Sequence, residues 1–471
     1  MYLTIDRNSQ ITLIRQIYQA IKNQILTGLL KPYEKLPSTR QLSKELGLSR
    51  NVIIEAYDQL IAEGYVEARE SAGTFVADGI ILEHYKASTE IKRENILGLR
   101  HEPMEGLIDF RTGVPNLDLF PKEIWADIYK KICQDLPSIQ LDYHEPRGCY
   151  DLRFELTHYL RRVRGVKCQP EQVLITTGAA QVFTMLGRLF HPINNLVFVE
   201  DPLSHGIIAS LEKTNMRIHS IPTDEKGMIT DLLPSDLQPS LIFTTPSHQY
   251  PMGSVLPIKR RIDLIRYARD KSSYIVEDDY DSEFRYEGDP IESMQSLDPN
   301  RVIYVGTFSK ILCPALRIGY MILPEHLIEG AKAIKYAEDL HSPVLEQLTL
   351  ARFIREGYLD KHVRKSIKLY QHKSQLVIKT LQEVFGDQIK IIGHTSGIHL
   401  VIHFKDVIFD NNLFKQLKNK GIAVPSVEEH AIIKGLYRQQ IMIGYGNLSD
   451  EEIVEGITRI YQVLTEFFSL A

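Results

Sequence analysis

Five short apolar runs in the central part of the chain most constrain how it can fold. Each is rich in β-branched or aromatic residues and is followed at once by small, polar or charged ones: QVLITTGAAQ, NLVFVEDPLS, SLIFTTPSHQYP, SYIVEDDYDSEF and RVIYVGTFSK. Helical segments separate the runs, and strands that alternate with helices predict a mainly parallel sheet with right-handed crossovers. Ligands of such sheets bind beyond the carboxyl ends of the strands. We therefore expect the polar residues after all five runs to converge on one edge of the sheet.

The residue types at this edge suit one kind of ligand. The small residues of TTGAAQ open a helix, so that its backbone N–H groups can face an anion. Hydroxyl and guanidinium donors that suit a phosphate follow the last run: Thr307, Ser309 and Arg317. After another run, Asp278 can pair with a protonated ring nitrogen and Tyr280 with a ring hydroxyl, while Lys310 supplies an amine. Together these groups indicate pyridoxal phosphate, an aldehyde held as a Schiff base.

Each of these residues also has an ordinary interpretation. A single lysine at a strand end is usually a solvated surface residue, an Asp-Asp pair is usually a turn, and an arginine after an apolar run is usually part of an ion pair. TTGAAQ alone is weak evidence for phosphate binding. The joint pattern, in this order along the chain, favours the cofactor.

The first eighty residues follow a helical pattern instead. Apolar residues recur at helical spacing and Gly28 then offers a stop; they are Ile14, Ile17, Tyr18, Ile21 and Ile25. In LPSTRQLSKELG, Ser38 can cap a second helix, with Gln41 completing a capping box, and Gly47 ends it. A third helix begins at LSRNVIIEAYDQLIAEG with Ser49 as its capping residue. Its apolar stripe consists of Ile53, Ala56, Tyr57, Leu60 and Ile61.

Only a GLS turn separates the second and third helices, which predicts a helix-turn-helix. The third helix would present Arg50, Asn51 and Ile54 near its start, where recognition helices contact bases. GYVEARESAGTFVA then alternates like a small hairpin with Gly73 near its tip, which makes a wing. Pattern alone equally allows a small helical domain without a partner. Residues 1–80 carry nine Lys and Arg against nine Asp and Glu, so DNA binding must rest on local placement.

The length and composition of the chain limit its class of protein and its number of domains. A chain of 471 residues, 44% hydrophobic and 24% charged, is globular and long enough for several domains. We divide it into a winged helix at 1–78, a linker at 79–106 and a larger domain at 107–471. No apolar run reaches the roughly eighteen residues of a membrane helix, and no signal peptide is recognised. The four cysteines have no metal-ligand spacing, so we expect a cytoplasmic protein without a metal site or a membrane.

LPSTRQLSKELGLSRNVIIEAYDQLIAEGYVEARESAGTFV resembles the winged helix of the GntR regulators. The resemblance implies binding to double-stranded operator DNA. The residues that it places at the DNA are Ser38, Arg40, Ser49, Arg50, Asn51 and Gly73. Ile54 stands where the family often has a further polar contact.

TPSHQYPMG, VEDDYDSEFRY and VGTFSKILCPALRIGY resemble the fold type I aminotransferase domain that is fused to such winged helices in the MocR or GabR type of regulator. This implies a mainly parallel α/β sheet with a smaller α+β C-terminal subdomain, and a homodimer. Lys310 would form the internal aldimine, Asp278 would pair with the pyridine nitrogen, and Tyr280 would contact the ring oxygen. The phosphate would be held by Gly178, Ala179, Ala180, Thr307, Ser309 and Arg317, with Tyr143 reaching the neighbouring subunit's phosphate.

The resemblance also indicates where an effector would bind. Arg438 would hold a ligand carboxylate by a planar fork, and His248 and Gln249 would line the pocket. Family members commonly carry an aromatic residue that stacks on the cofactor where this chain has Ser204, and His205 is a candidate substitute. Gly206 replaces an arginine of the GABA-responsive member, which argues against GABA as the ligand.

Three functions are consistent with part of these observations. A transcriptional regulator would sense an amino-acid or amine ligand through external aldimine formation or through binding beside the cofactor. A working aminotransferase would use the same residues, and the sequence leaves turnover open. A structural nucleoid protein would not account for the cofactor residues. The DNA-binding module and the missing stacking aromatic favour the regulator.

Overall fold

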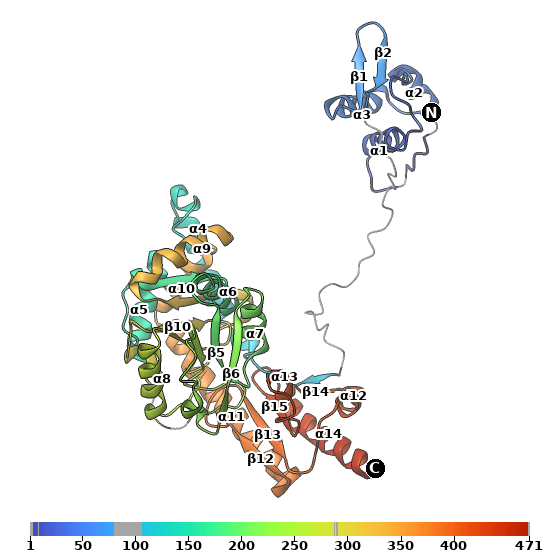
Figure 1. Ribbon diagram of the computed structural model, residues 1–471. Helices are drawn as coiled ribbons and strands as arrows, with labels where there is room; N and C mark the ends of the chain where they lie inside the picture. Colours follow the sequence, from blue (N-terminus) through green and yellow to red (C-terminus); the bar gives the residue numbers. More distant parts are fainter. Residues whose placement is uncertain (1–2, 8, 80–105, 287, 289–290, 470–471) are drawn as a thin grey trace. The chain divides into compact units, whose positions relative to one another are not determined.

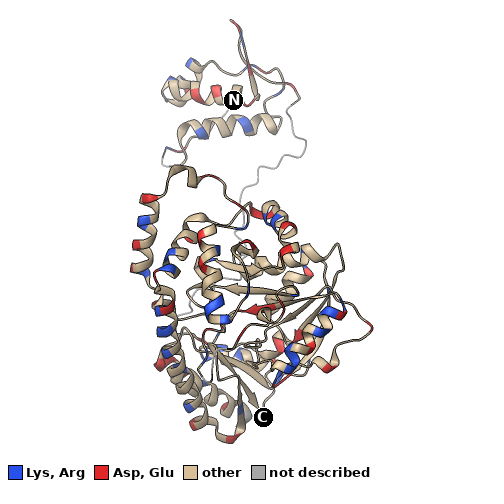
Figure 2. Cartoon of the chain, turned by 90° about the vertical axis from the view of Figure 1, so that its left-hand side faces the viewer, with Lys and Arg blue, Asp and Glu red and all other residues tan. Residues whose placement is uncertain are grey.

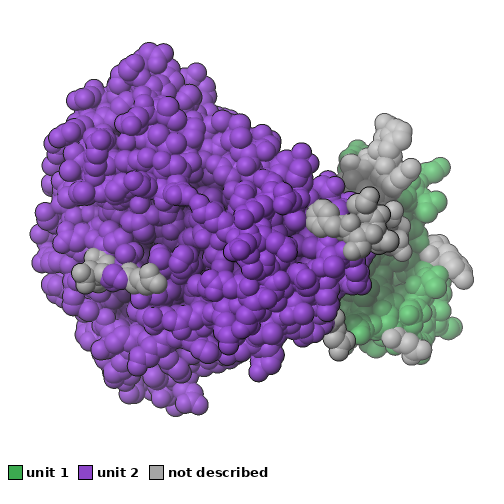
Figure 3. All heavy atoms as spheres, turned by 90° about the horizontal axis from the view of Figure 1, so that it is seen from below, with its two compact units in different colours: residues 1–102 green, residues 103–471 purple. Residues whose placement is uncertain are grey.

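The computed structural model describes residues 3–7, 9–79, 106–286, 288 and 291–469. The chain divides into two compact units, Met1–Glu102 and Pro103–Ala471, which are coloured separately in Figure 3. The predicted linker at 79–106 lies almost entirely outside the described residues.

The N-terminal unit is a winged helix. Its elements are α1(Leu13–Leu26), α2(Thr39–Leu46), α3(Arg50–Ala62), β1(Val66–Arg69) and β2(Gly73–Val76), and β1 and β2 pair as an antiparallel hairpin. The helices enclose a core that includes Ile17, Ile21, Leu42, Ile53 and Leu60, each at most 1% exposed. The apolar spacing of the sequence therefore produces the expected three helices and wing.

Three local predictions in this unit are wrong. The Ser38 hydroxyl accepts a hydrogen bond from the Gln41 backbone N–H (3.2 Å), but the Gln41 side chain donates to Glu45 instead of closing a capping box. Ser49 occupies the first position before α3, yet its side chain makes no capping hydrogen bond. Ile61 is 36% exposed, because it lies at the edge of the apolar stripe rather than within it.

The larger unit is built on an eight-stranded sheet with the order β4-β11-β10-β9-β8-β5-β6-β7 (Figure 1). Its strands are β4(Val173–Thr176), β5(Leu196–Asp201), β6(Arg217–Asp224), β7(Gly227–Met228), β8(Leu241–Thr244), β9(Tyr274–Asp279), β10(Val302–Thr307) and β11(Gly319–Ile322). β6, β5, β8, β9 and β10 are parallel, whereas β11 is antiparallel to both β10 and β4. Because β4 and β10 are both antiparallel to β11, they run in the same direction. The five strands predicted from the sequence, which are β4, β5, β8, β9 and β10, therefore run in one direction and end at one edge. The predicted mainly parallel sheet is confirmed.

Helices cover both faces of this sheet. One face packs against α6(Ala179–Phe190), α7(His205–Glu212) and α9(Ile328–Asp339). The other packs against α5(Tyr150–Arg164), α8(Ile258–Asp270) and α10(Val344–Arg355), with α4(Lys122–Asp135) lying on α10. Because both faces are buried, the central strands are continuous apolar runs rather than alternating ones.

The C-terminal part forms a smaller α+β subdomain. Its elements are β3(Ile108–Asp109), α11(Tyr358–Phe385), β12(Ile389–Ile392), β13(His399–Phe404), α12(Asn411–Asn419), β14(Ile422–Ala423), α13(Val427–His430), β15(Gln440–Gly444) and α14(Asp450–Ser469). β12, β13 and β15 form an antiparallel sheet, and β14 pairs with β3. The predicted smaller subdomain is confirmed. Within the described ranges no helix has the length and apolar character needed to cross a membrane.

Candidate functional site

A cavity of about 280 Å³ opens at the carboxyl edge of the large sheet. Its walls come from segments that are far apart in the sequence. From the strand ends it takes Ala179, Ala180, Ser204, Thr245, Asp278, Tyr280, Thr307, Ser309, Lys310 and Arg317. The remaining lining residues are Thr112, Gly113, Phe183, Ile207, Tyr250, Ile398 and His399. All five strands that the sequence singled out thus contribute to one cavity.

Lys310 follows β10 and extends its amine into this cavity. Its Nζ donates a hydrogen bond to the Gly113 backbone oxygen at 2.6 Å. Burial lowers the pKa of Lys310, although the carboxylates of Asp281 and Asp278 oppose that change. A lowered pKa increases the share of neutral amine, which is the nucleophilic form.

Asp278 lies near the end of β9 and is buried. Its Oδ1 has no hydrogen-bond partner among the described residues. Burial, together with the nearby carboxylates of Asp279 and Asp281, raises the pKa of Asp278 to about 7. A buried carboxylate that lines a cavity and lacks a partner is suited to a cationic donor such as a protonated ring nitrogen.

The start of α6 lines another part of the cavity and has features that suit an anion. Gly178 precedes the helix with φ of 117°, and a Cβ there would lie 2.7 Å from Nη2 of Arg317. Close approach of the guanidinium to the helix start therefore requires glycine at this position. The hydroxyl of Thr307 accepts from the Ser309 backbone N–H at 3.2 Å, so these two side chains are held together. Helix N–H groups, hydroxyls and a guanidinium form a suitable cradle for a phosphate.

Tyr280 lines the cavity, and the buried His248 contacts it from behind. The Tyr280 hydroxyl lies 3.1 Å from Nδ1 of His248, and the same nitrogen lies 2.9 Å from Oδ1 of Asp281. The rings of His248 and Tyr280 are stacked with centroids 5.9 Å apart. His248 thus orients Tyr280 instead of lining the cavity as expected. The Gln249 amide is buried and donates to Pro202 O at 2.8 Å, so it joins strand-end segments.

Three predicted ligand or cofactor residues lie away from the cavity. Arg438 is exposed and precedes β15 without reaching the cavity wall. The His205 side chain is exposed at the start of α7, where its backbone N–H donates to Nδ1 of His430 at 3.4 Å. Tyr143 is 80% exposed, with its ring 6.2 Å from that of His341.

Several cavity residues escaped sequence reasoning. Thr112 and Gly113 follow β3, and His399 begins β13, so they belong to segments remote from the strand ends. Ser204 does line the cavity and supplies no aromatic ring there. Tyr250 also lines the cavity, with its hydroxyl 2.8 Å from Oγ1 of Thr112. The only signal for it was its place in the PSHQYP turn.

The predicted DNA-contacting residues lie on the surface of the winged helix. Ser38, Arg40, Ser49, Arg50, Asn51 and Gly73 are all exposed. Nε of Arg50 donates to Oγ1 of Thr39 at 3.3 Å, which joins the starts of α3 and α2. Gly73 has φ of 112°, and a Cβ there would lie 2.8 Å from Lys35. Figure 2 shows charged residues of both signs on the helices, in agreement with the balanced charge of residues 1–80.

Comparison with known proteins assigns both units. Residues 13–76 match the family model of bacterial regulatory proteins of the gntR family, and residues 108–460 match that of class I and II aminotransferases. The uncharacterized HTH-type transcriptional regulator YhdI of Bacillus subtilis (strain 168) is 33% identical over 97% of this chain and 96% of its own length. The probable rhizopine catabolism regulatory protein MocR of Rhizobium meliloti is 31% identical over 97% and 95%. The chain belongs to the MocR-type regulators of the GntR family.

A solved structure supports the cofactor of this MocR-type chain. Kynurenine aminotransferase of Pyrococcus horikoshii, solved in complex with PMP, is 28% identical over 77% of this chain and 91% of its own, with a TM-score of 0.70. The cavity of the present chain fits pyridoxal phosphate. The donors around Arg317 suit its phosphate, the Lys310 amine suits its aldehyde, and the Asp278 oxygen suits its ring nitrogen.

Proposed function

We propose that this MocR-type chain is a transcriptional regulator that binds double-stranded DNA through its winged helix. Its larger unit binds pyridoxal phosphate and a small amino acid or amine. The observation that carries the proposal is the unpartnered, buried Asp278 oxygen in the same cavity as the Lys310 amine. The same chain presents Arg40, Arg50 and Asn51 on an exposed recognition surface. The regulator acts in the cytoplasm, where its DNA is.

The residues of the cavity have distinct tasks in this function. Pyridoxal phosphate, when bound, supplies an aldehyde that condenses with amines and a ring that accepts electrons. Asp278 holds a proton at the ring nitrogen, because a buried carboxylate gains a cationic partner there. Arg317 and the start of α6 bind the phosphate, with Thr307 and Ser309 as further donors. Lys310 would provide the amine, and Tyr280, whose hydroxyl contacts His248, would contact the ring oxygen.

An effector bound in the cavity can change how the large sheet and the C-terminal subdomain pack together. The cavity is closed by residues of the large sheet on one side and by Ile398 and His399 of the C-terminal subdomain on the other. A ligand that binds one packing of these parts more tightly shifts the equilibrium toward it, by no more than its differential affinity. Arg438 is the candidate partner for an effector carboxylate. Because Arg438 is exposed and outside the cavity wall, that contact requires a movement of its segment.

The functional form is a homodimer in this proposal. Tyr143 follows a short segment whose apolar side chains are exposed, with Ile139 at 76% and Leu141 at 67%. Exposed large apolar residues that are clustered in sequence mark a surface for a partner. A second copy would cover them and would bring Tyr143 to the neighbouring phosphate.

The central experiment measures cofactor and DNA binding on the full chain. Purified protein titrated with pyridoxal phosphate should gain a visible absorbance band, and binding to its own promoter fragment should change when an effector amine alters that band. Amines and amino acids are screened by the spectral shift. A spectrum at saturating pyridoxal phosphate that equals the sum of the spectra of the free protein and the free cofactor would refute the proposed function.

A working aminotransferase is the second candidate, favoured by the complete set of Lys310, Asp278, Tyr280 and Arg317 around one cavity. It predicts sustained formation of a keto acid from an amino acid over many turnovers. A single turnover at most, with DNA affinity that follows the cofactor state, identifies the regulator instead.

A further inference from the structure

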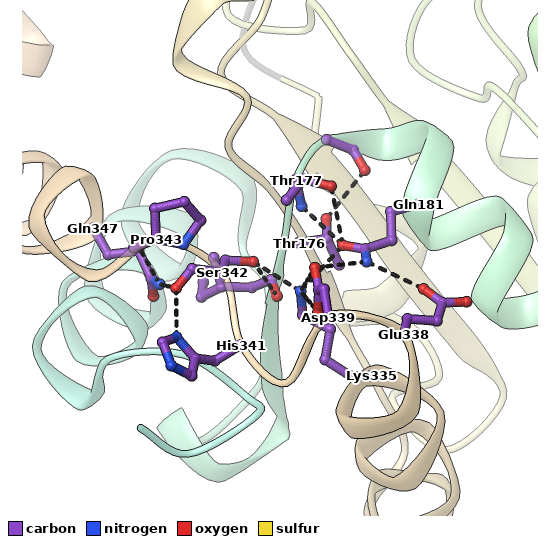
Figure 4. A network of polar contacts seen from close by, with 12 residues as sticks. Thr176, Thr177, Gln181, Lys335, Glu338, Asp339, His341, Ser342, Pro343 and Gln347 are labelled. Carbon is purple, nitrogen blue, oxygen red and sulfur yellow. Dashed lines mark hydrogen bonds and ion pairs between the residues drawn. The ribbon is translucent and has the colours of Figure 1, made fainter. Parts of the chain in front are cut away.

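A buried lysine lies behind the phosphate cradle and outside the cavity. Lys335, on α9, is 0% exposed. Its ammonium donates to both carboxylate oxygens of Asp339 at 2.7 Å, to Oγ of Ser342 at 2.9 Å and to Oε1 of Gln181 at 3.2 Å. Figure 4 shows these side chains pointing toward one another from α6, α9 and the segment after α9. The ammonium of Lys335 is therefore paired with a carboxylate and hydrogen-bonded inside the protein.

Gln181 connects Lys335 to the turn before α6 through hydrogen bonds. Its Oε1 accepts from the Thr177 backbone N–H at 2.9 Å and from the Thr177 hydroxyl at 3.2 Å, in addition to Lys335. Its Nε2 donates to Glu338 at 3.1 Å and to Asp339 at 3.0 Å. All the polar atoms of the Gln181 side chain are engaged, so its position is fixed from both sides (Figure 4). A fixed Gln181 in turn holds the backbone of Thr177.

Thr177 immediately precedes the residues that face the phosphate. Gly178 has φ of 117° and leads directly into Ala179 and Ala180, which line the cavity. The hydroxyl of Thr176 donates to Gly178 O at 3.1 Å, and Ser342 Oγ donates to Ile175 O at 3.4 Å. The turn is thus held on the side away from the cavity. The direction of its N–H groups depends on that support, since an anion site requires several donors aimed at one point.

We propose that Lys335 is a positioning residue for the phosphate end of the cofactor site. Through Gln181 it fixes the turn at Thr177 and Gly178, so that the N–H groups at the start of α6 converge on the phosphate. The inference rests on the proposed binding of pyridoxal phosphate. It assigns a function to a residue that does not contact the cavity.

A purely structural ion pair is the alternative, and it makes a different prediction. Such a pair would stabilise α9 and affect all ligands of the unit equally. Positioning of the phosphate turn affects only ligands that carry a phosphate. Lys332 offers a matched control because it lies on the same helix, is one third exposed and has only distant carboxylates, Glu329 at 3.9 Å and Glu145 at 4.0 Å.

The test compares pyridoxal phosphate with pyridoxal, which lacks the phosphate, on the full cofactor-free chain. In Lys335→Met the affinity for pyridoxal phosphate should fall by roughly tenfold, the equivalent of one charge-assisted hydrogen bond, with affinity for pyridoxal unchanged. Inorganic phosphate should raise the Tm of the wild-type chain and of Lys332→Met, and should raise that of Lys335→Met much less. Equal losses for both vitamers in Lys335→Met would overturn the inference.

A second variant keeps the test decisive if Lys335→Met does not fold. Gln181→Met leaves the Lys335–Asp339 ion pair in place and removes the hydrogen bonds of the Gln181 amide, to Thr177 on one side and to Lys335, Glu338 and Asp339 on the other. It should show the same phosphate-selective loss, and an unchanged preference for the phosphorylated vitamer would contradict the inference. Absence of pyridoxal phosphate binding in the wild-type chain would instead refute the proposed function itself.

Discussion

The winged helix and the larger unit place their candidate functional side chains in opposite surroundings. Arg40, Arg50 and Asn51 are exposed on the winged helix, above a core that they do not touch. Asp278 is buried in the larger unit, and Lys310 lies in a cavity where burial alters its pKa. The exposed side chains of the winged helix suit a charged ligand that stays hydrated. The buried side chains of the larger unit suit a small ligand that displaces water from the cavity.

In the winged helix, the candidate functional residues can be changed with little loss of stability. In the larger unit, the same buried residues affect both ligand binding and stability. An exposed arginine can be removed at little cost to folding, because surface substitutions rarely change stability by more than about 0.5 kcal/mol. A buried carboxylate without a partner destabilises the cofactor-free fold until its ligand arrives. The predictions below test this contrast.

The largest effect is expected at Lys310. Lys310→Ala removes the amine that contacts Gly113 in the cavity wall, so covalent attachment of pyridoxal phosphate should be lost completely. Mass spectrometry after borohydride reduction measures the adduct, and Lys332→Ala serves as the control. Adduct on the Lys310→Ala chain would show that another residue carries the cofactor.

Truncation of the winged-helix core should unfold one unit and spare the other. Leu60 is 0% exposed, and Leu60→Ala should destabilise this unit by about 2–5 kcal/mol, whereas Ile61→Ala, at a residue 36% exposed, should have little effect. Amide hydrogen exchange over residues 13–76 should rise in Leu60→Ala alone. The fluorescence of Trp125, the one tryptophan of the chain, should not change because it lies in the larger unit. A change there would mean that the two units fold together.

Asp278 makes the stability of the cofactor-free larger unit depend on pH. The folded pKa of about 7 lies above the ordinary value of 3.8, so the contribution of Asp278 is fully present below pH 3.8 and is lost as the pH rises through about 7. Relative to Asp278→Asn, the wild-type chain should lose up to about 1.4 kcal/mol per pH unit over this interval. Urea unfolding followed by Trp125 fluorescence measures it, with exposed Asp127→Asn as control. Parallel pH profiles for wild type and Asp278→Asn would contradict the burial of this carboxylate.

The smallest effect is expected at the DNA surface. Arg50→Ala should weaken binding by roughly 1–3 kcal/mol and, if the contact is to a phosphate, should reduce the salt slope by about one. Fluorescence anisotropy at several salt concentrations separates the two cases. Arg15→Ala, on α1 outside the helix-turn-helix, should match the wild type. An affinity that is flat in salt would exclude the proposed DNA contact.

The sequence predicted much of the site because the chemistry is placed at strand ends. Apolar runs followed by polar residues located Asp278, Thr307 and Lys310, and parallel strands bring such residues to one edge. The same logic could not find Thr112 or His399, since packing alone brings them to the cavity from other segments. It did not find Tyr250 either, whose only signal was its place in the PSHQYP turn. Nor could it place Arg438, because an arginine before a strand can face either solvent or a ligand.

By itself the sequence determined the two units, their secondary structure and the residues that carry the cofactor chemistry. Periodicity and local motifs act over a few residues, and so they can be recognised along the chain. Only the tertiary structure decided that the Asp278 Oδ1 has no hydrogen-bond partner among the described residues, that His248 contacts Tyr280, and that Lys335 contacts Gln181. These outcomes depend on contacts between residues more than thirty positions apart, in which burial and hydrogen bonding are settled by the packed fold as a whole.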